Sequence, residues 1–153
     1  MSDSDEIFLA LEQPLEAAAE RVARVLGLEF NGDLRAETGE LQYRAPAKTF
    51  DGVIGVYIGP NRFLPEPDEM QAMDGYPIVI DVQSRHQKDA QEQEARLAFD
   101  ALVAALPDVP AILSHNAEIL VAAHLPGAGT HDFEPDVTLD DPDIEVWRPW
   151  VAG

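Results

Sequence analysis

Three extended stretches decide the fold of this chain: LQYRA (41–45), VIGVYI (53–58) and YPIVIDV (76–82). The first alternates apolar and polar residues, and the other two are rich in β-branched side chains, as strands are. No helical pattern separates them, so they are expected to pair in an antiparallel or mixed sheet. Residues 59–75 hold three prolines, two glycines and four acids, and this composition predicts a long loop before the third stretch.

Two helices flank these strands in the sequence. Residues 14–26 are predicted to be helical, because their apolar residues recur at the spacing of one helical face and Gly27 is a natural stop. A second helix is predicted from about Lys88 to Leu106, with Pro107 ending it.

The remaining extended segments are shorter. Strands are expected in residues 6–11 and 111–113, and Ile144–Trp147 is a candidate for a last strand. Residues 117–125 fit either the second strand of a hairpin or a short helix. Beyond Pro126 the chain is otherwise expected to be loop-like.

These elements predict a single α+β domain over residues 1–153, with an antiparallel or mixed sheet and two main helices packed on one face. Residues 127–153 are expected to be an acidic, aromatic-flanked C-terminal segment packed on this domain or extending from it. No apolar run reaches the about 18 residues of a spanning helix, and the acidic start is unlike a secretory signal. Cysteine is absent, which removes disulfides and thiolate chemistry. A cytoplasmic protein is therefore expected.

The charge is strongly negative and unevenly placed. The net charge is -19, and residues 1–20 and 132–145 hold six and seven acids without one Lys or Arg. Such a field disfavours nucleic acid and anionic membranes as partners and favours a basic protein. Only Lys48 and Lys88 are lysines, which also fits a salt-adapted host in which the acidity has no partner. Both interpretations stay open at this point.

One turn carries residues of the kind used in catalysis. Asp81, Ser84 and His86 follow a predicted strand and can in principle supply an orienting group, a nucleophile and a base, as in a small hydrolase. No Gly-rich elbow supports the serine, however, and polar residues are ordinary in a surface connection. The four histidines of the chain show no metal-ligand spacing. They are His86, His115, His124 and His131. We therefore expect a protein that is not an enzyme, with no catalytic residue, metal or cofactor.

The C-terminal acids are flanked by aromatic residues, namely Phe133, Trp147 and Trp150. In one interpretation this segment docks a basic protein, with carboxylates steering the encounter and tryptophan supplying anchor area. In the other, the aromatic residues tie the tail to the core and the acids are simply solvated.

Four features of the sequence are considered together: FLAL (8–11), the following Pro14-Leu15, LGLEF (26–30) and the predicted strand YPIVI (76–80) with its succeeding helix. In these features the chain resembles small acidic immunity proteins of bacterial polymorphic toxin systems. The resemblance implies a protein that binds and blocks a partner toxin, often a basic nuclease. No functional residue is carried over from it.

The leading hypothesis is thus a non-enzymatic, immunity-type inhibitor that neutralises a basic toxin through an acidic surface. The alternatives are the small hydrolase and the acid-rich domain of a salt-adapted host. The residues predicted to bind the partner lie in the tail and the long loop: Asp132, Glu134, Asp136, Asp140, Asp141, Asp143, Trp147 and Trp150, then Glu66, Asp68, Glu69 and Asp74.

Overall fold

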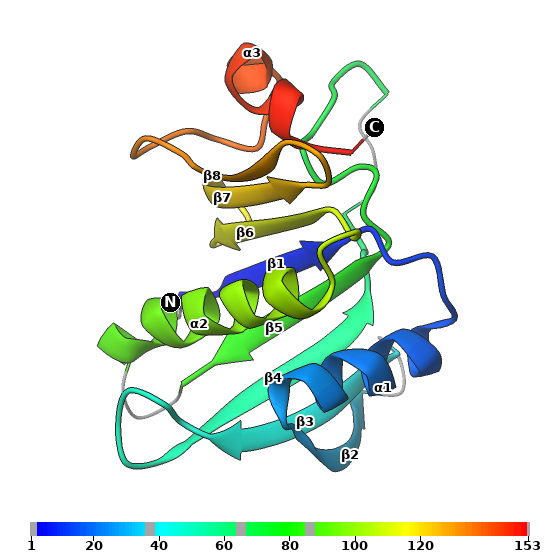
Figure 1. Cartoon of the computed structure of the whole chain (residues 1–153), viewed down its shortest axis with the longest axis vertical. Helices are drawn as coiled ribbons and strands as arrows, with labels where there is room; N and C mark the ends of the chain where they lie inside the picture. Colours follow the sequence, from blue (N-terminus) through cyan, green and yellow to red (C-terminus); the bar gives the residue numbers. More distant parts are fainter. Residues whose placement is uncertain (1–2, 36–38, 64–66, 85–87, 153) are drawn as a thin grey trace.

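The computed structural model describes residues 3–35, 39–63, 67–84 and 88–152. Within these residues, eight antiparallel strands form one sheet in the order β2-β3-β4-β5-β1-β6-β7-β8 (Figure 1). The strands are β1 (Asp5–Leu9), β2 (Glu29–Arg35), β3 (Glu40–Pro46), β4 (Val53–Pro60), β5 (Ile78–Gln83), β6 (Ala111–His115), β7 (Ile119–Leu125) and β8 (Gly129–Asp132). The earliest strand in the sequence, β1, therefore lies at the centre, with β5 on one side and β6 on the other.

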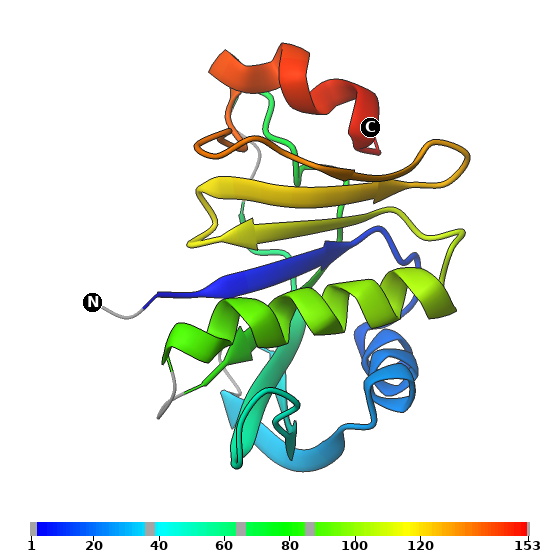
Figure 2. The same cartoon turned by 60° about the vertical axis from the view of Figure 1, so that its left-hand side comes forward.

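Two helices, α1 (Leu15–Leu26) and α2 (Lys88–Ala105), cover one face of this sheet (Figures 1 and 2). Their buried side chains, such as Val22 and Phe99, pack with alternate residues of the strands in the larger core. The α+β architecture with both main helices on one face is confirmed. It arises because each helix has one apolar side that only the sheet can bury.

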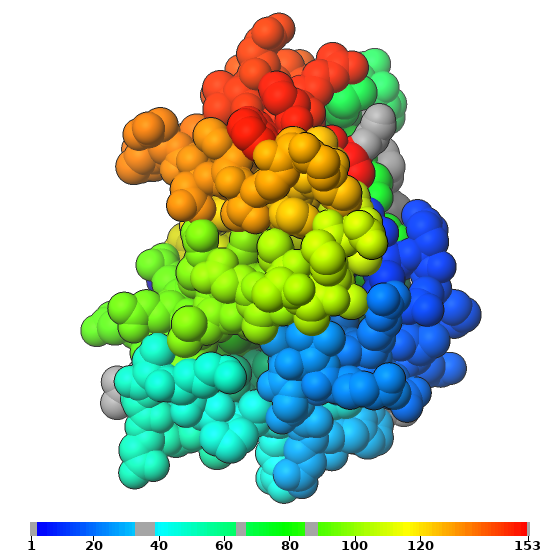
Figure 3. Space-filling view, viewed as in Figure 1, coloured from blue at the N-terminus to red at the C-terminus, as the bar shows by residue number. Residues whose placement is uncertain are grey.

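The opposite face of the sheet is covered, over β1, β6 and β7, by part of the long loop and by the C-terminal tail. Residues 72–76 of the long loop and residues 133–152 form a second core there with Phe8 and Ile112. In the tail, η1 (Asp141–Asp143), α3 (Ile144–Trp147) and η2 (Arg148–Trp150) follow one another. In the space-filling view the tail, coloured orange to red, adjoins the green loop at one end of the molecule (Figure 3).

The expected strand at Ile144–Trp147 is wrong, because this segment is the helix α3. Pro142 and Pro149 lie in the first turns of the two flanking 3-10 helices, where a proline loses no hydrogen bond. The indole of Trp147 is 1% exposed, and its Nε1 donates to the backbone oxygen of Asp140 at 3.0 Å. The tail is thus packed on the domain.

The hairpin interpretation of residues 117–125 is correct, because β7 pairs with β6 there. Its turn places Asn116 and Ala117 at φ values of 56° and 50°, in the left-handed region. The expectation of loop beyond Pro126 missed β8, which pairs with β7 through its backbone although GTHD has no apolar pattern. The structure has no helix, among the described residues, that is long and apolar enough to cross a membrane.

Candidate functional site

The long loop and the tail are far apart in the sequence but meet at one end of the molecule, where one contact joins residues 69 positions apart, Gln71 and Asp140. The Ala72 N–H donates to the Leu139 carbonyl at 2.9 Å, and Gln71 Nε2 donates to Asp140 Oδ1 at 2.8 Å. The Ala152 N–H donates to the Tyr76 hydroxyl oxygen at 2.9 Å. We call residues 67–76 and 132–152 together the acidic end. The predicted partner-binding acids of the long loop and of the tail, apart from Glu66, thereby belong to segments that meet at one end of the molecule.

The acids of this end differ in exposure. Asp140, Asp143 and Asp74 are half-buried, as is Trp150, whereas Trp147 belongs to the second core. Glu66 lies outside the described residues. The exposed acids are Asp68, Glu69, Asp132, Glu134, Asp136, Asp141 and Glu145. Among the residues expected to bind a partner, six acids are therefore exposed: Asp68, Glu69, Asp132, Glu134, Asp136 and Asp141.

The half-buried acids organise the segment itself. Asp143 Oδ2 accepts hydrogen bonds from the Thr138 backbone N–H and hydroxyl, each at 2.8 Å, and these bonds hold the pKa of Asp143 below its usual value. Asp74 Oδ2 accepts from the Gln71 N–H at 2.9 Å, while Asp74 Oδ1 is shielded from water without a hydrogen-bond partner in the structure. These contacts fix the loop and tail in one conformation.

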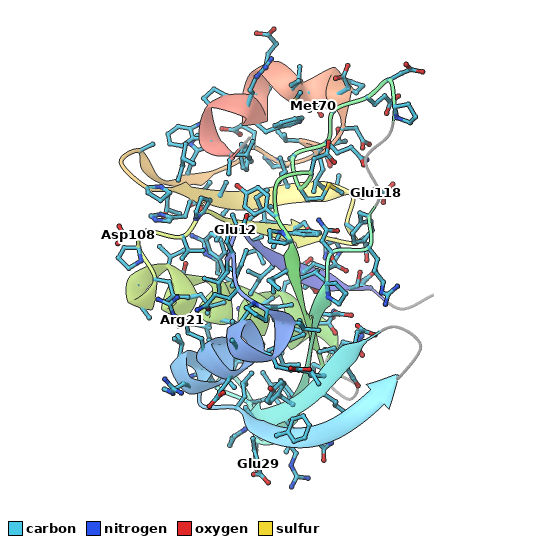
Figure 4. The ribbon with its side chains drawn as sticks, turned by 90° about the vertical axis from the view of Figure 1, so that its right-hand side faces the viewer. Glu12, Arg21, Glu29, Met70, Asp108 and Glu118 are labelled. Atoms are coloured by element: carbon cyan, nitrogen blue, oxygen red, sulfur yellow. The ribbon has the colours of Figure 1, made fainter. Side chains whose placement is uncertain are left out.

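A hollow of about 430 Å³ lies between the loop and the end of the tail. Figure 4 shows Met70 beside the terminal helical segment. The walls are mainly apolar, with Met70 46% exposed, and Arg148 and Asp74 add one charge of each sign. The full lining is Met70, Gln71, Ala72, Asp74, Gly75, Trp147, Arg148, Val151 and Ala152. A concave apolar surface bordered by charge suits an anchoring side chain of a partner.

A second group of polar residues lies where β1 begins and where its neighbours β5 and β6 end. Asp5 is the register partner of His115 on β6, and Glu6 is the register partner of Asp81 on β5. Because side chains alternate along a strand, Asp5 and His115 face α2 and Glu6 and Asp81 face the opposite side. Glu92 reaches the first pair from α2.

His115 joins two carboxylates in this region. Its Nδ1 lies 2.8 Å from Asp5 Oδ1 and 3.3 Å from Glu92 Oε1. Partial burial disfavours the imidazolium, but the hydrogen bond to Asp5 and the negative charges of Asp5 and Glu92 raise the pKa of His115. We call Asp5, Glu92 and His115 the strand-end cluster. It is the group among the described residues whose geometry suits a metal ion.

The carboxylates of Glu6 and Asp81, on the side of the sheet opposite α2, are poorly solvated. Burial, and then the charges of Glu6 and Glu40, raise the pKa of Asp81 to about 6, although a hydrogen bond from Gln83 opposes the shift. Burial likewise raises the pKa of Glu6. Asp81 Oδ1 is shielded from water and has no hydrogen-bond partner in the structure.

The hydrolase alternative needs Asp81, Ser84 and His86 to converge. Asp81 faces the side of the sheet opposite the helices, while Ser84 follows β5 and donates its backbone N–H to Gln91 of α2. Ser84 is 2% exposed, and its buried Oγ has no hydrogen-bond partner in the structure. His86 lies outside the described residues. The described part of this turn therefore pairs no nucleophile with a base.

The other histidines have local partners. The ring of His124 contacts Thr130 Oγ1 through Nδ1 at 3.1 Å and the Pro107 carbonyl through Nε2 at 2.9 Å. The ring of His131 stacks on Trp150 with centroids 4.3 Å apart. His115 alone among these three joins carboxylates from other elements.

No protein-family model, curated protein or solved structure matches this chain.

Proposed function

We propose that the chain is a cytoplasmic, non-enzymatic, immunity-type inhibitor. It captures a basic protein, such as a toxin nuclease, with its acidic end. One observation carries the proposal. Two acid-bearing segments, distant in sequence, are joined by hydrogen bonds at one end of the molecule, and a mainly apolar hollow lies between them. Acidity alone is compatible with many proteins, but a convergent arrangement with an anchoring hollow favours a docking surface.

The charge of the surface supports a basic partner. Arg148 is the one Lys or Arg within residues 67–76 and 132–152, and Asp132 is the exposed acid there that pairs with a cation, Arg96, at 2.8 Å. The carboxylates of Asp68, Glu69, Asp141 and Glu145 are exposed. Such a field speeds the encounter with a positively charged groove and weakens as salt is added.

The hollow supports a lasting complex. Steering acts mainly on the association rate, whereas the dissociation rate depends on a few well-buried contacts. A basic side chain entering the hollow lays its aliphatic stem along Met70 and Val151 and places its charged head near Asp74, the acid of the lining, and away from Arg148. Because loop and tail are already fixed to each other, little conformational entropy is lost on binding.

The test compares two variants with equal loss of charge. The first neutralises the acidic end with Asp68→Asn, Glu69→Gln, Asp141→Asn and Glu145→Gln. The control neutralises four exposed acids elsewhere with Glu12→Gln, Glu16→Gln, Asp51→Asn and Asp108→Asn. The tagged wild-type chain is first used to recover its partner from native host extract at low salt. The purified partner is then titrated with all three proteins by calorimetry at low and moderate salt.

The proposal expects one basic partner in stoichiometric amount, and inhibition of its activity by the wild-type chain. The acidic-end variant should bind about tenfold more weakly or worse, and the control should stay within about threefold of wild type. Recovery of no stoichiometric basic partner contradicts the proposal. Equal weakening by both variants shows that net charge acts without a docking surface, as in a salt-adapted protein.

A further inference from the structure

The strand-end cluster combines the three ligand types of a common divalent metal site. One imidazole nitrogen and two carboxylate oxygens lie within 4.8 Å of one another, and they come from β6, β1 and α2. A histidine nitrogen distinguishes the group from an ordinary patch of surface acids. Nitrogen together with carboxylate suits zinc and similar transition metals better than calcium or magnesium, which take oxygen ligands.

The two separations that involve His115 are close to what such an ion requires. Two ligands at about 2.0–2.1 Å from a tetrahedral ion lie about 3.3 Å apart. The separations here are 3.3 Å from His115 Nδ1 to Glu92 Oε1 and 2.8 Å to Asp5 Oδ1. Entry of an ion therefore needs the loss of any proton on Nδ1 and a widening of about half an ångström between His115 Nδ1 and Asp5 Oδ1, with the movement at the more exposed His115. The Glu92 side chain is 67% exposed and free to adjust.

The surroundings orient the least mobile ligand. Asp5 has a side chain that is only 4% exposed, and its Oδ2 accepts a hydrogen bond from Gln91 Nε2 at 2.8 Å. Gln91 is itself held, because its Oε1 accepts from the Ser84 N–H at 2.9 Å. This arrangement occupies one oxygen of Asp5 and presents the other to His115, as outer hydrogen bonds do in metal sites.

The electrostatics at this place also favour a cation. Within the described residues, neither Asp5 nor Glu92 forms an ion pair with a Lys or Arg, and His115 is the group that joins them. Asp3 adds further negative charge nearby. A buried carboxylate is costly unless it is paired or coordinates a metal. Either an imidazolium proton or a metal ion can supply the missing positive charge.

We propose that Asp5, Glu92 and His115 form a binding site for a zinc-class divalent cation with three protein ligands. A fourth position is left to water, because the side chains of Glu92 and His115 are 67% and 23% exposed. The ion links β1, β6 and α2 and so fastens the centre of the sheet to the helix above it. This departs from the sequence-based expectation of no metal, and it is independent of the partner proposed for the acidic end.

The test is a titration of the chelator-treated full chain with Zn²⁺, and separately with Ca²⁺, by calorimetry and thermal unfolding. Co²⁺ absorption reports on nitrogen and oxygen coordination. Glu92→Gln and His115→Gln change the exposed ligands, since a substitution at the buried Asp5 risks unfolding. Asp89→Asn, an exposed acid of the same helix, and His131→Gln are the matched controls.

The expected result is one Zn²⁺ per chain, a higher melting temperature with zinc, and weaker Ca²⁺ binding. Each ligand variant should weaken Zn²⁺ binding about tenfold or more, while both controls bind as wild type does. No saturable Zn²⁺ binding overturns the proposal and leaves a proton as the bridging cation. Binding that is weakened by His131→Gln but not by His115→Gln also overturns it, because the ion is then held elsewhere.

Discussion

Carboxylates occur in two contrasting regions of this chain. At the acidic end most of them are exposed, and hydrogen bonds from Thr138 lower the pKa of Asp143. Around α2 and the ends of the central strands, Glu6 and Glu94 are 7% and 2% exposed, and Asp81 is costly to ionise. The net charge of a region therefore does not tell what its carboxylates do. Burial and hydrogen bonding decide whether a carboxylate is available at the surface or holds the fold together.

The largest effect on stability is expected at Glu94, a buried carboxylate whose two oxygens both accept hydrogen bonds. Both oxygens of Glu94 accept hydrogen bonds from the Lys48 N–H, and Glu94 Oε2 also accepts from the Thr49 N–H at 2.7 Å and from Thr49 Oγ1 at 2.6 Å. Glu94→Ala leaves these donors without a partner, and we expect it to lower the free energy of unfolding by about 3 kcal/mol.

Urea denaturation measures this change. Glu94→Gln, which keeps one acceptor oxygen, should lose less than the alanine variant. A loss below about 1 kcal/mol for Glu94→Ala contradicts the distinction between the two regions, because surface substitutions produce changes of that size.

The second effect concerns Asp81 and depends on pH. The pKa of Asp81 is raised from 3.8 to about 6, so its contribution to stability is present below about pH 4 and is lost as the pH rises through 6. Asp81→Asn removes this loss. Relative to wild type, the variant should gain about 2 kcal/mol in unfolding free energy between pH 4 and pH 7.5.

Urea denaturation at the two pH values tests it, with Asp108→Asn as the exposed control. Parallel pH profiles for Asp81→Asn and wild type would show that this carboxyl group ionises without cost, and that the two regions do not differ here.

The smallest effect concerns Asp143, whose contribution to stability changes with pH in the opposite direction to that of Asp81. The hydrogen bonds from Thr138 lower the pKa of Asp143 from 3.8, so its contribution to stability is present above that value and is lost as the pH falls through the lowered pKa. Asp143→Asn should lower the melting temperature at pH 7 but hardly at pH 2. The exposed Glu145→Gln should leave the melting temperature unchanged at both. An equal shift for both variants would mean that Asp143 has no special role in holding the tail.

Local patterns predicted much of the secondary structure. The period of α1 and the β-rich run of β4 are properties of neighbouring residues, and the structure agrees with both. β2 was missed because its pairing with β3 shifts register between Phe30 and Gly32, which interrupts the alternation that marks a strand. β8 was missed because an edge strand of four residues needs only backbone partners.

The sites were harder to predict because they are assembled from distant residues. The acids of the loop and tail were identified individually, but the bond between Gln71 and Asp140 that unites the two segments leaves no local pattern. Asp5 and His115 are 110 residues apart, and only the position of β1 beside β6 brings them together. The one available signal was an acidic pair, Asp5 and Glu6, entering an otherwise apolar strand.

The central position of β1 has a consequence for how the chain reaches this structure. Ile7 pairs with Ile80 and with Leu113, so the earliest of these eight strands in the sequence cannot complete its pairing until both later partners exist. The β3–β4 and β6–β7 hairpins have short connections and can form early, whereas β1 closes two long chain loops. Docking of this strand is thus the expected slow step of folding, and until it occurs the edges of β5 and β6 are open to pairing with other chains.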